Sequence, residues 1–523
     1  MEIPRDAKPA LARFGLATLL LLTGLSAAGI LLHGYHFGFD DQSVYLPAIK
    51  KRLDPGLYPF DADFFLLQTH LGIFADVIAA TVRLTRLPLA WVVFLWHFAN
   101  VFLLLAGCWR IARLCFRTAA AICGSLLLVT VLLTLPVAGT FIVLCEPYLH
   151  ARAPSTALLL FAFADVLERR LTAAIWAVLA LLVHPTLALI GLWHVAVQAW
   201  PAEKQNSSAP APRPATSIAA FMASPMMPLA FALALGPTNL LAQWFADPSS
   251  SAWREALSGR RYLFPPQWTW YEQLGAFAPF LILFAFVPLA QRNSLPTLAR
   301  VCRRLIFSGA VGVAAGYAIG LTPALLPLVP LEPMRTLHLV YLFMVLFTGG
   351  LSAELLAPRW KLAATALLLP LAFGMFTAQR AELNGSAHIE WPGAAPRNDW
   401  VDAFNWIRLR TPRDALFAMN PGLLALPREN EHGFRGLAER SQLAESAKDR
   451  AVSRNIPGLA WAWRDQVHAQ QGIDIFTVEQ LRDLRVRYGV TWLLLWKGAE
   501  RGNAPPNLDC PYENATARVC RAP

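Results

Sequence analysis

Residues 16–42 read LATLLLLTGLSAAGILLHGYHFGFDDQ. The apolar run Leu16–Leu32 approaches the roughly 20 residues that a helix needs to cross a bilayer. Asp40 and Asp41 follow this run after a short segment rich in aromatic residues. Because a charged group costs several kcal/mol in hydrocarbon, an acidic pair at a membrane edge either faces water or serves a buried polar site. The stretch therefore predicts a membrane helix that ends beside a candidate functional site.

The composition of the whole chain extends this prediction. Of the 523 residues, 56% are hydrophobic and 15% are charged, and the mean hydropathy is +0.43. Most of such a chain cannot face water. We expect a polytopic α-helical membrane protein with about 11 transmembrane helices, the last of which ends near Phe376.

The C-terminal part of the chain has a different character. From about residue 380 onward charged residues become frequent, and the apolar runs shorten to strand length, as in Thr491–Trp496. A segment of this size can form its own core. We predict a transmembrane domain over 1–378 and a soluble α/β domain over 379–523.

The distribution of Lys and Arg predicts the orientation of the spans. Basic residues mark alternate connections, which the positive-inside rule places in the cytoplasm together with the N-terminus. This pattern requires a helix break at His184-Pro185, because proline removes a backbone donor and clashes with the preceding turn. The outside loops are then 34–88, 139–152, 239–272 and 322–332, with the C-terminal domain on the same side.

The net charge of +11 does not indicate nucleic-acid binding, since the cytoplasmic connections account for much of the excess. Among the seven cysteines, Cys510 and Cys520 form an isolated pair in the domain predicted to lie outside. An oxidising compartment would allow a disulfide there.

The first two outside loops carry the acidic candidates. The motif Asp40-Asp41-Gln42 opens the first loop, and the second contains Glu146 followed by His150 and Arg152. Glu146 and a first-loop acid could divide base and positioning roles, or Asp41 and Glu146 could hold a divalent cation such as Mg²⁺ or Mn²⁺. Glu146 could equally pair with Arg152.

The later outside loops carry the basic candidates. Arg260 and Arg261 lie among aromatic residues, and arginine suits bidentate recognition of phosphate. Arg335, three residues before His338, is expected to begin a helix whose first turn favours anions. The alternative for Arg335 is an arginine that extends its side chain from the interface towards water.

Taken together, these features resemble the GT-C class of integral-membrane glycosyltransferases. The resemblance spans nearly the whole chain and rests on the acidic first loop, the second acid, the His-Pro break and the C-terminal outside domain. Two C-terminal segments are also similar to the periplasmic domains of bacterial members, namely Trp400–Ala415 and Arg487–Trp492. The motifs are short, and the likeness is mainly one of architecture.

The resemblance implies a multi-pass protein of the bacterial inner membrane with a periplasmic C-terminal domain. It implies transfer of a sugar from a polyprenyl-phosphate donor to a glycan, lipid or protein acceptor. In this class a first-loop acid is the general base or a metal ligand, which corresponds to Asp40 or Asp41, and the second acid corresponds to Glu146. Basic residues of late loops bind phosphate, which corresponds to Arg335 and then to Arg260 or Arg261.

Two features of the sequence refine this expectation, and two alternatives stay open. The amide of Gln42 in the acidic motif favours a base that works without metal, and the absence of a Trp-Trp-Asp motif disfavours protein asparagine as the acceptor. A flippase or transporter of lipid-linked saccharides, or an inactive GT-C-like scaffold, would share the architecture. A transporter needs a polar path through the spans, whereas the acids of this chain concentrate at one face.

Overall fold

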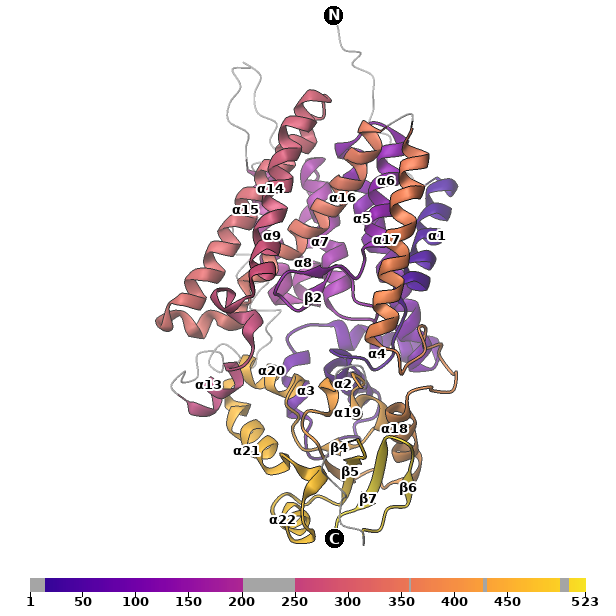
Figure 1. The fold of residues 1–523 in the computed structure, drawn as a ribbon, viewed down its shortest axis with the longest axis vertical. Helices are drawn as coiled ribbons and strands as arrows, with labels where there is room; N and C mark the ends of the chain where they lie inside the picture. The colour runs from indigo at the N-terminus through magenta and orange to yellow at the C-terminus, as the bar shows by residue number, and fades with distance from the viewer. Residues whose placement is uncertain (1–14, 201–249, 357–358, 427–429, 499–507) are drawn as a thin grey trace, which may run out of the picture.

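In the computed structural model the described residues are 15–200, 250–356, 359–426, 430–498 and 508–523. The start of the predicted cytoplasmic segment, up to residue 14, and residues 239–249 of the predicted loop 239–272 lie outside these ranges. Within them the protein is a helical bundle joined to an α/β region, and the two stack along the long axis of the molecule (Figure 1).

Five of the described helices are long and apolar enough to cross a membrane, and they make this an α-helical membrane protein. They are α1 (Leu16–His33), α5 (Leu89–Cys115), α14 (Trp270–Arg292), α15 (Pro296–Leu321) and α16 (Thr336–Leu355), the last preceded by the short turn η4 (Pro333–Arg335). A sixth span would result if α3 (Asp63–Thr69) and α4 (Phe74–Thr85), which meet at 96°, were counted together.

Shorter or less apolar helices complete the bundle. They are α6 (Ala119–Val131), α7 (Arg152–Leu167), α8 (Ala173–Val183), α9 (Pro185–Ala199) and α17 (Trp360–Glu382). Helix α8 ends at Val183 and α9 begins at Pro185, so the helix break predicted at His184-Pro185 is present. The His184 ring accepts a hydrogen bond from the Leu187 amide at 3.3 Å and so caps the second helix.

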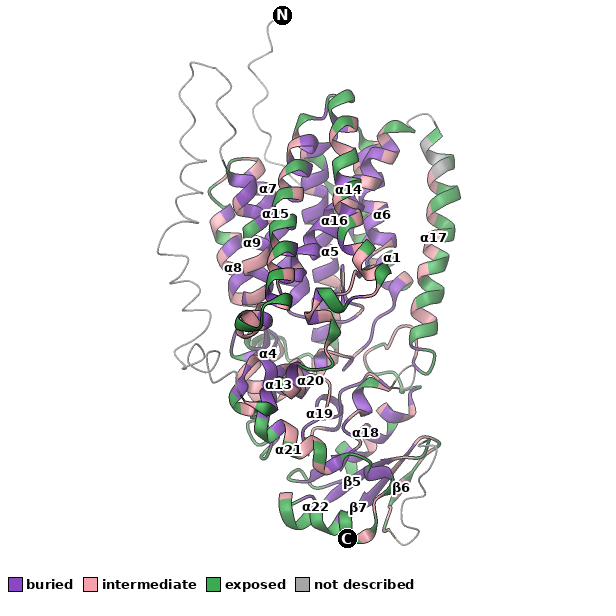
Figure 2. Ribbon diagram, turned by 60° about the vertical axis from the view of Figure 1, so that its left-hand side comes forward, coloured by how far each residue is buried: buried purple, intermediate pink, exposed green. Residues whose placement is uncertain are grey.

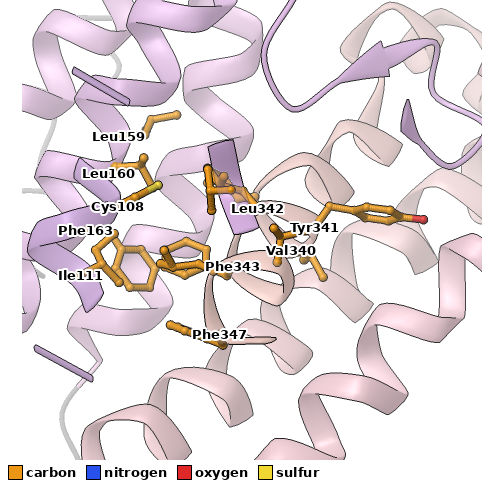
Figure 3. Close-up of a cluster of buried hydrophobic side chains, with 14 of the residues drawn as sticks. Cys108, Ile111, Leu159, Leu160, Phe163, Val340, Tyr341, Leu342, Phe343 and Phe347 are labelled. Carbon is orange, nitrogen blue, oxygen red and sulfur yellow. The ribbon is translucent and has the colours of Figure 1, made fainter. Parts of the chain in front are cut away.

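Close packing of α5, α7 and α16 forms the centre of the bundle (Figure 3). Phe163 of α7 and Phe343 of α16 lie with their ring centroids 4.5 Å apart, and Cys108 of α5 lies in the same cluster. Helices α6 and α16 approach even more closely, because a Cβ at Gly349 would lie 2.3 Å from the Gly124 carbonyl oxygen. Such small-residue contacts are typical of membrane helices.

The outer faces of the bundle are apolar. Figure 2 shows α17 at its edge with most of its surface exposed, and that surface includes Leu367 and Phe373. Helix α14 likewise exposes Leu281 and Phe284. An exposed apolar belt of this kind fits a lipid environment.

The first predicted outside loop is helical and packs beneath the bundle. It contains α2 (Gln42–Leu53) together with α3 and α4, which share a core with the start of α5. Helix α1 begins at the opposite end of the bundle from this layer and from the C-terminal region (Figure 1).

The C-terminal region contains a five-stranded mixed sheet. Its strand order is β4 (Ser441–Gln442), β3 (Leu416–Met419), β5 (Trp492–Trp496), β7 (Ala517–Arg521) and β6 (Tyr512–Glu513). The first three strands are parallel, and β7 pairs antiparallel with β5 and β6. Strand β5 lies in the predicted run Thr491–Trp496, and a disulfide joins Cys510 to Cys520.

Helices and turns surround this sheet and link it to the bundle. The helices are α18 (Asp399–Arg410), α19 (Phe434–Ala438), α20 (Lys448–Asn455), α21 (Ala460–Gln470) and α22 (Val478–Tyr488). Helix α13 (Ser251–Leu257), which precedes α14 in the chain, packs on α20 and α21, where Arg450 donates to the Ala256 carbonyl at 3.1 Å. The bundle and the C-terminal region therefore share an extended interface.

Candidate functional site

A cavity of about 550 Å³ lies where the bundle meets the C-terminal region. It is rich in ionisable side chains from distant parts of the sequence. Its polar lining includes Asp40, Asp41, His150, Arg152, His184, Arg260, Glu332, Arg335, Glu382, Glu431, Lys448 and Arg454. A concave site with convergent charges is the usual form of a ligand or active site.

A larger cavity, of about 710 Å³, lies between α2, α18 and the segment 389–398. Each carboxylate that lines it already has a cationic or histidine partner. Asp54 pairs with Arg413, Glu390 contacts two histidines, and Glu439 pairs with Lys50. The smaller cavity carries the stronger candidate chemistry, because it holds the predicted acids and arginines together.

The backbone of the C-terminal region positions the acidic motif. The Asp40 amide donates to the Glu431 carbonyl at 2.7 Å, and the Gly433 amide donates to the Gly38 carbonyl at 2.7 Å. These bonds pair residues 38–40 antiparallel with 431–433, and Phe39 lies opposite His432. The first loop thus acquires its geometry from a segment almost 400 positions away in the sequence.

Asp40 itself has a left-handed backbone conformation, with φ of +46°. A non-glycine residue in this region is uncommon and is often found at functional sites. The side chain of Asp40 accepts a hydrogen bond from the Tyr148 hydroxyl at 2.7 Å and forms an ion pair with Lys448. The Ser43 amide and hydroxyl both donate to the Asp40 carbonyl, at 3.0 and 2.5 Å, and hold the turn.

Asp41 is surrounded by cations. Its Oδ2 lies 2.7 Å from the Arg152 guanidinium and its Oδ1 lies 2.7 Å from Lys448 Nζ. Burial raises the pKa of Asp41, but Lys448 and Arg152 outweigh burial and hold this pKa well below its usual range. Asp41 is therefore ionised at neutral pH and has little affinity for a further proton.

Arg152 also binds the second predicted acid. Its Nε donates to Glu146 Oε1 at 2.7 Å, and both side chains are buried. The two carboxylates proposed as metal ligands, Asp41 and Glu146, are thus bridged by one guanidinium. Among the described residues no group of three His, Cys, Asp or Glu side chains is arranged to hold a metal ion. A metal role for Asp41 and Glu146 stays a prediction, and it would require Arg152 to move.

Gln42 and His150 both contact the first-loop segment that carries the acids. Gln42 is buried, accepts from the Gly38 amide at 2.7 Å and donates to the Leu149 carbonyl at 3.0 Å, so it ties the first loop to the second. The His150 ring lies 3.4 Å from Asp41 and lines the cavity. Gln42 is not among the residues that line the cavity.

Arg335 lines the cavity from the helical bundle and directly precedes α16. The turn η4 runs into α16, so the Arg335 amide donates to Glu332 and the Thr336 amide to Pro333 and Met334. The amides of Arg335 and Thr336 are therefore occupied, and the Arg335 guanidinium is the group that would bind an anion there.

Glu332 pairs with Arg335 and, at 2.5 Å, with Arg454 of α20, which also donates to the Tyr262 hydroxyl at 2.6 Å. Glu332 is a second cavity residue in the left-handed conformation, with φ of +48°.

Of the remaining predicted residues, one lines the cavity and two do not. Arg260 lines the cavity and donates to the Ala447 carbonyl at 2.5 Å, directly before Lys448. Arg261 and His338 are not among its lining residues. Arg261 is exposed and pairs with Glu272, whereas His338 is buried in α16 and contacts the Leu144 carbonyl at 3.1 Å.

Sequence reasoning missed the contribution of the C-terminal region. Glu431, Lys448 and Arg454 line the cavity beside the predicted residues, and Tyr148 binds Asp40. Lys448 and Arg454 belong to a charged helical stretch, SAKDRAVSRN, which in the sequence looks like any solvated helix. Only their tertiary contacts distinguish them, namely those of Lys448 with the acidic motif and of Arg454 with Glu332.

Comparison of the chain with protein-family models and with curated proteins found no match.

Proposed function

We propose that this protein is a membrane glycosyltransferase that moves a sugar from a polyprenyl-phosphate donor to a glycan, lipid or protein acceptor. The observation that carries the proposal is the cavity at one end of the apolar bundle, in which the first-loop acids meet Arg152, Arg335 and Lys448. A lipid-linked donor needs such a site, because its prenyl chain stays in the membrane while its phosphate and sugar enter a polar pocket.

The basic residues divide into two groups in this proposal. Arg335 and Arg454 share the single carboxylate Glu332, so their combined positive charge is only partly balanced and suits the donor phosphate. Arg152 and Lys448 are committed to the acids and keep Asp41 ionised. Asp40 and Asp41 then orient the acceptor hydroxyl and stabilise the positive charge that develops at the anomeric carbon.

The reaction is an attack of the acceptor oxygen on the anomeric carbon. A carbon–oxygen bond forms to the acceptor, whose hydroxyl proton passes to a carboxylate of the cavity, and the bond from the anomeric carbon to the phosphate oxygen breaks. The polyprenyl phosphate leaves with the bonding electrons, and the Arg335 guanidinium stabilises its charge. The bridging of Asp41 and Glu146 by Arg152 favours a reaction without Mg²⁺ or Mn²⁺.

The proposal includes an arrangement in the membrane. The chain has about 11 spans, with a cytoplasmic N-terminus in the bacterial inner membrane. The cavity and the C-terminal domain face the periplasm, where the donor sugar is exposed.

The test is transfer of radiolabelled sugar in proteoliposomes from a panel of polyprenyl-phosphate sugars, with and without EDTA. We expect transfer by the wild type in both conditions and a loss of about 100-fold or more in Arg335→Gln. The matched control is Arg292→Gln, because Arg292 is an exposed arginine at the C-terminal end of α14 and does not line the cavity. Asp40→Asn, Asp41→Asn and Glu146→Gln separate the roles of the acids.

A folded protein that transfers no sugar from any donor would contradict the proposal and favour transport or a scaffold. Loss of transfer in EDTA, restored by Mg²⁺ or Mn²⁺, would instead assign Asp41 and Glu146 to a metal.

A further inference from the structure

Glu431 occupies a fixed position beside the acidic motif. Its carbonyl accepts the Asp40 amide, and the neighbouring Asn430 is anchored by its own side chain, which donates to the Leu423 carbonyl at 3.0 Å. On the other side the His432 ring contacts Glu390 at 2.9 Å. Residues on both sides of Glu431 are therefore held, and its side chain lines the cavity with Asp40 and Asp41.

The carboxyl group of Glu431 differs from three other acids that line the cavity. Asp40, Asp41 and Glu332 each pair with Lys or Arg. Within the part of the chain that the structure describes, no hydrogen bond or ion pair engages the Glu431 carboxyl, and the residue is half-buried. This carboxyl is therefore available to a ligand in the cavity.

The charges around Glu431 favour its protonated form. Burial is the largest influence, followed by the carboxylates of Asp40 and Glu382, whereas Lys448 and His432 act in the opposite direction. Together they raise the pKa of Glu431 to about 7. A general base is most effective when its pKa lies near the working pH.

We propose that Glu431 accepts the proton of the acceptor hydroxyl during sugar transfer, so that the C-terminal region supplies the general base of the site. This inference rests on the proposed function. As the acceptor oxygen bonds to the anomeric carbon and the polyprenyl phosphate leaves, the hydroxyl proton passes to the Glu431 carboxylate, which later releases it to water. Asp41, paired with Arg152 and Lys448, holds the positive side chains in place instead of accepting the proton.

The first test is kinetic and uses the full-length protein in proteoliposomes. We expect Glu431→Gln to lower kcat by about 100-fold or more, which is the usual contribution of a general base, and to leave KM for the donor unchanged. The wild-type rate should rise with pH through an acid limb near pH 7, and the variant should lack this limb. Glu431→Asp should restore part of the rate, and Glu479→Gln, at an exposed position on α22, is the control.

The second test does not depend on activity. Hydrophobic carbodiimides modify protonated, accessible carboxyl groups, so mass spectrometry should find Glu431 modified more at about pH 6 than at about pH 8, with Asp41 unmodified at both. Absence of modification at Glu431 would overturn the inference whatever the activity.

The two proposals can fail separately. If the wild type transfers sugar and Glu431→Gln does so equally well with the same pH profile, only the inference about Glu431 fails. If Glu431 is modified as expected but the wild type transfers no sugar, the proposed function fails and its base with it.

Discussion

Arg152 is the residue that joins the two acidic loops, because it binds Asp41 and Glu146 at once and is itself buried. Removing one partner from a buried ionic cluster leaves uncompensated charge and typically costs about 3–5 kcal/mol. We expect Arg152→Gln to lower the free energy of unfolding in detergent by about this amount. The measurement is chemical unfolding followed by tryptophan fluorescence.

A double variant separates lost charge pairing from lost packing. Arg152→Gln with Glu146→Gln removes one of the stranded carboxylates and should recover part of the lost stability. If Arg152→Gln unfolds like the wild type, the bridge contributes nothing and the cluster is not a structural unit.

Asp41 should make the free energy of unfolding depend on pH in the acid range. Its folded pKa lies below the unfolded value of 3.8, so its ionised form stabilises the protein fully above that value. This stabilisation is lost as the pH falls below 3.8 and through the folded pKa. In thermal unfolding from pH 7 into the acid range, the wild type should exceed Asp41→Asn at neutral pH and lose this advantage in acid. A constant difference between the two proteins would contradict the prediction.

At the scale of elements, the sequence predicts best what hydrophobicity and backbone chemistry decide locally. The run Leu16–Leu32 becomes α1, the His184-Pro185 break separates α8 from α9, and Thr491–Trp496 contains β5. What it predicts least is contact between distant elements. The meeting of Glu431 and Lys448 with Asp40 depends on how α20 and residues 430–433 dock on the first loop, and no local pattern encodes that docking.

Some of the predicted binding residues lie at the cavity and others do not. Asp40, Asp41, His150, Arg152, Arg260 and Arg335 converge on one cavity, and each lies in a connection or at a helix terminus rather than inside a helix. His338, only three residues beyond Arg335, lies inside α16 and away from the cavity lining, because one turn of helix carries it into the core.

The site depends on the pairing of residues 38–40 with 431–433. This pairing leaves no room for a side chain at Gly433. A Cβ at Gly433 would lie 2.4 Å from the Cβ of Ser43 and 2.7 Å from its Cα. Because backbone must shift to admit a methyl group, Gly433→Ala should destabilise the protein by about 1–3 kcal/mol and move Glu431 away from Asp40. Unfolding and sugar transfer measured together should both decline.

Gly458→Ala is the matched control, because a Cβ there meets nothing within 4 Å and the residue lies in the same region. If the two alanine variants unfold and transfer sugar equally well, the pairing of residues 38–40 with 431–433 tolerates an added methyl group.

At the scale of the whole molecule, the two ends of the bundle differ in chemistry. The acidic motif, the cavity and the C-terminal region lie at one end, whereas the α14–α15 connection lies at the end where α1 begins (Figure 1). The second end is rich in arginine, including Arg292, Arg300, Arg303 and Arg304. The positive-inside rule predicts that this end faces the cytoplasm, so the cavity is expected to open on the periplasmic side.

Cysteine labelling of intact spheroplasts tests this orientation. Glu479 on α22 and Asn293 between α14 and α15 are both exposed, and each can be replaced by cysteine. A membrane-impermeant maleimide should label Glu479→Cys in intact cells and Asn293→Cys only after permeabilisation. Four of the five free cysteines are buried and Cys123 is half-buried, so the parent protein treated in parallel gives the background. The reverse pattern would place the cavity in the cytoplasm, where a donor exposed to the periplasm could not reach it, and would rule out the proposed reaction as stated.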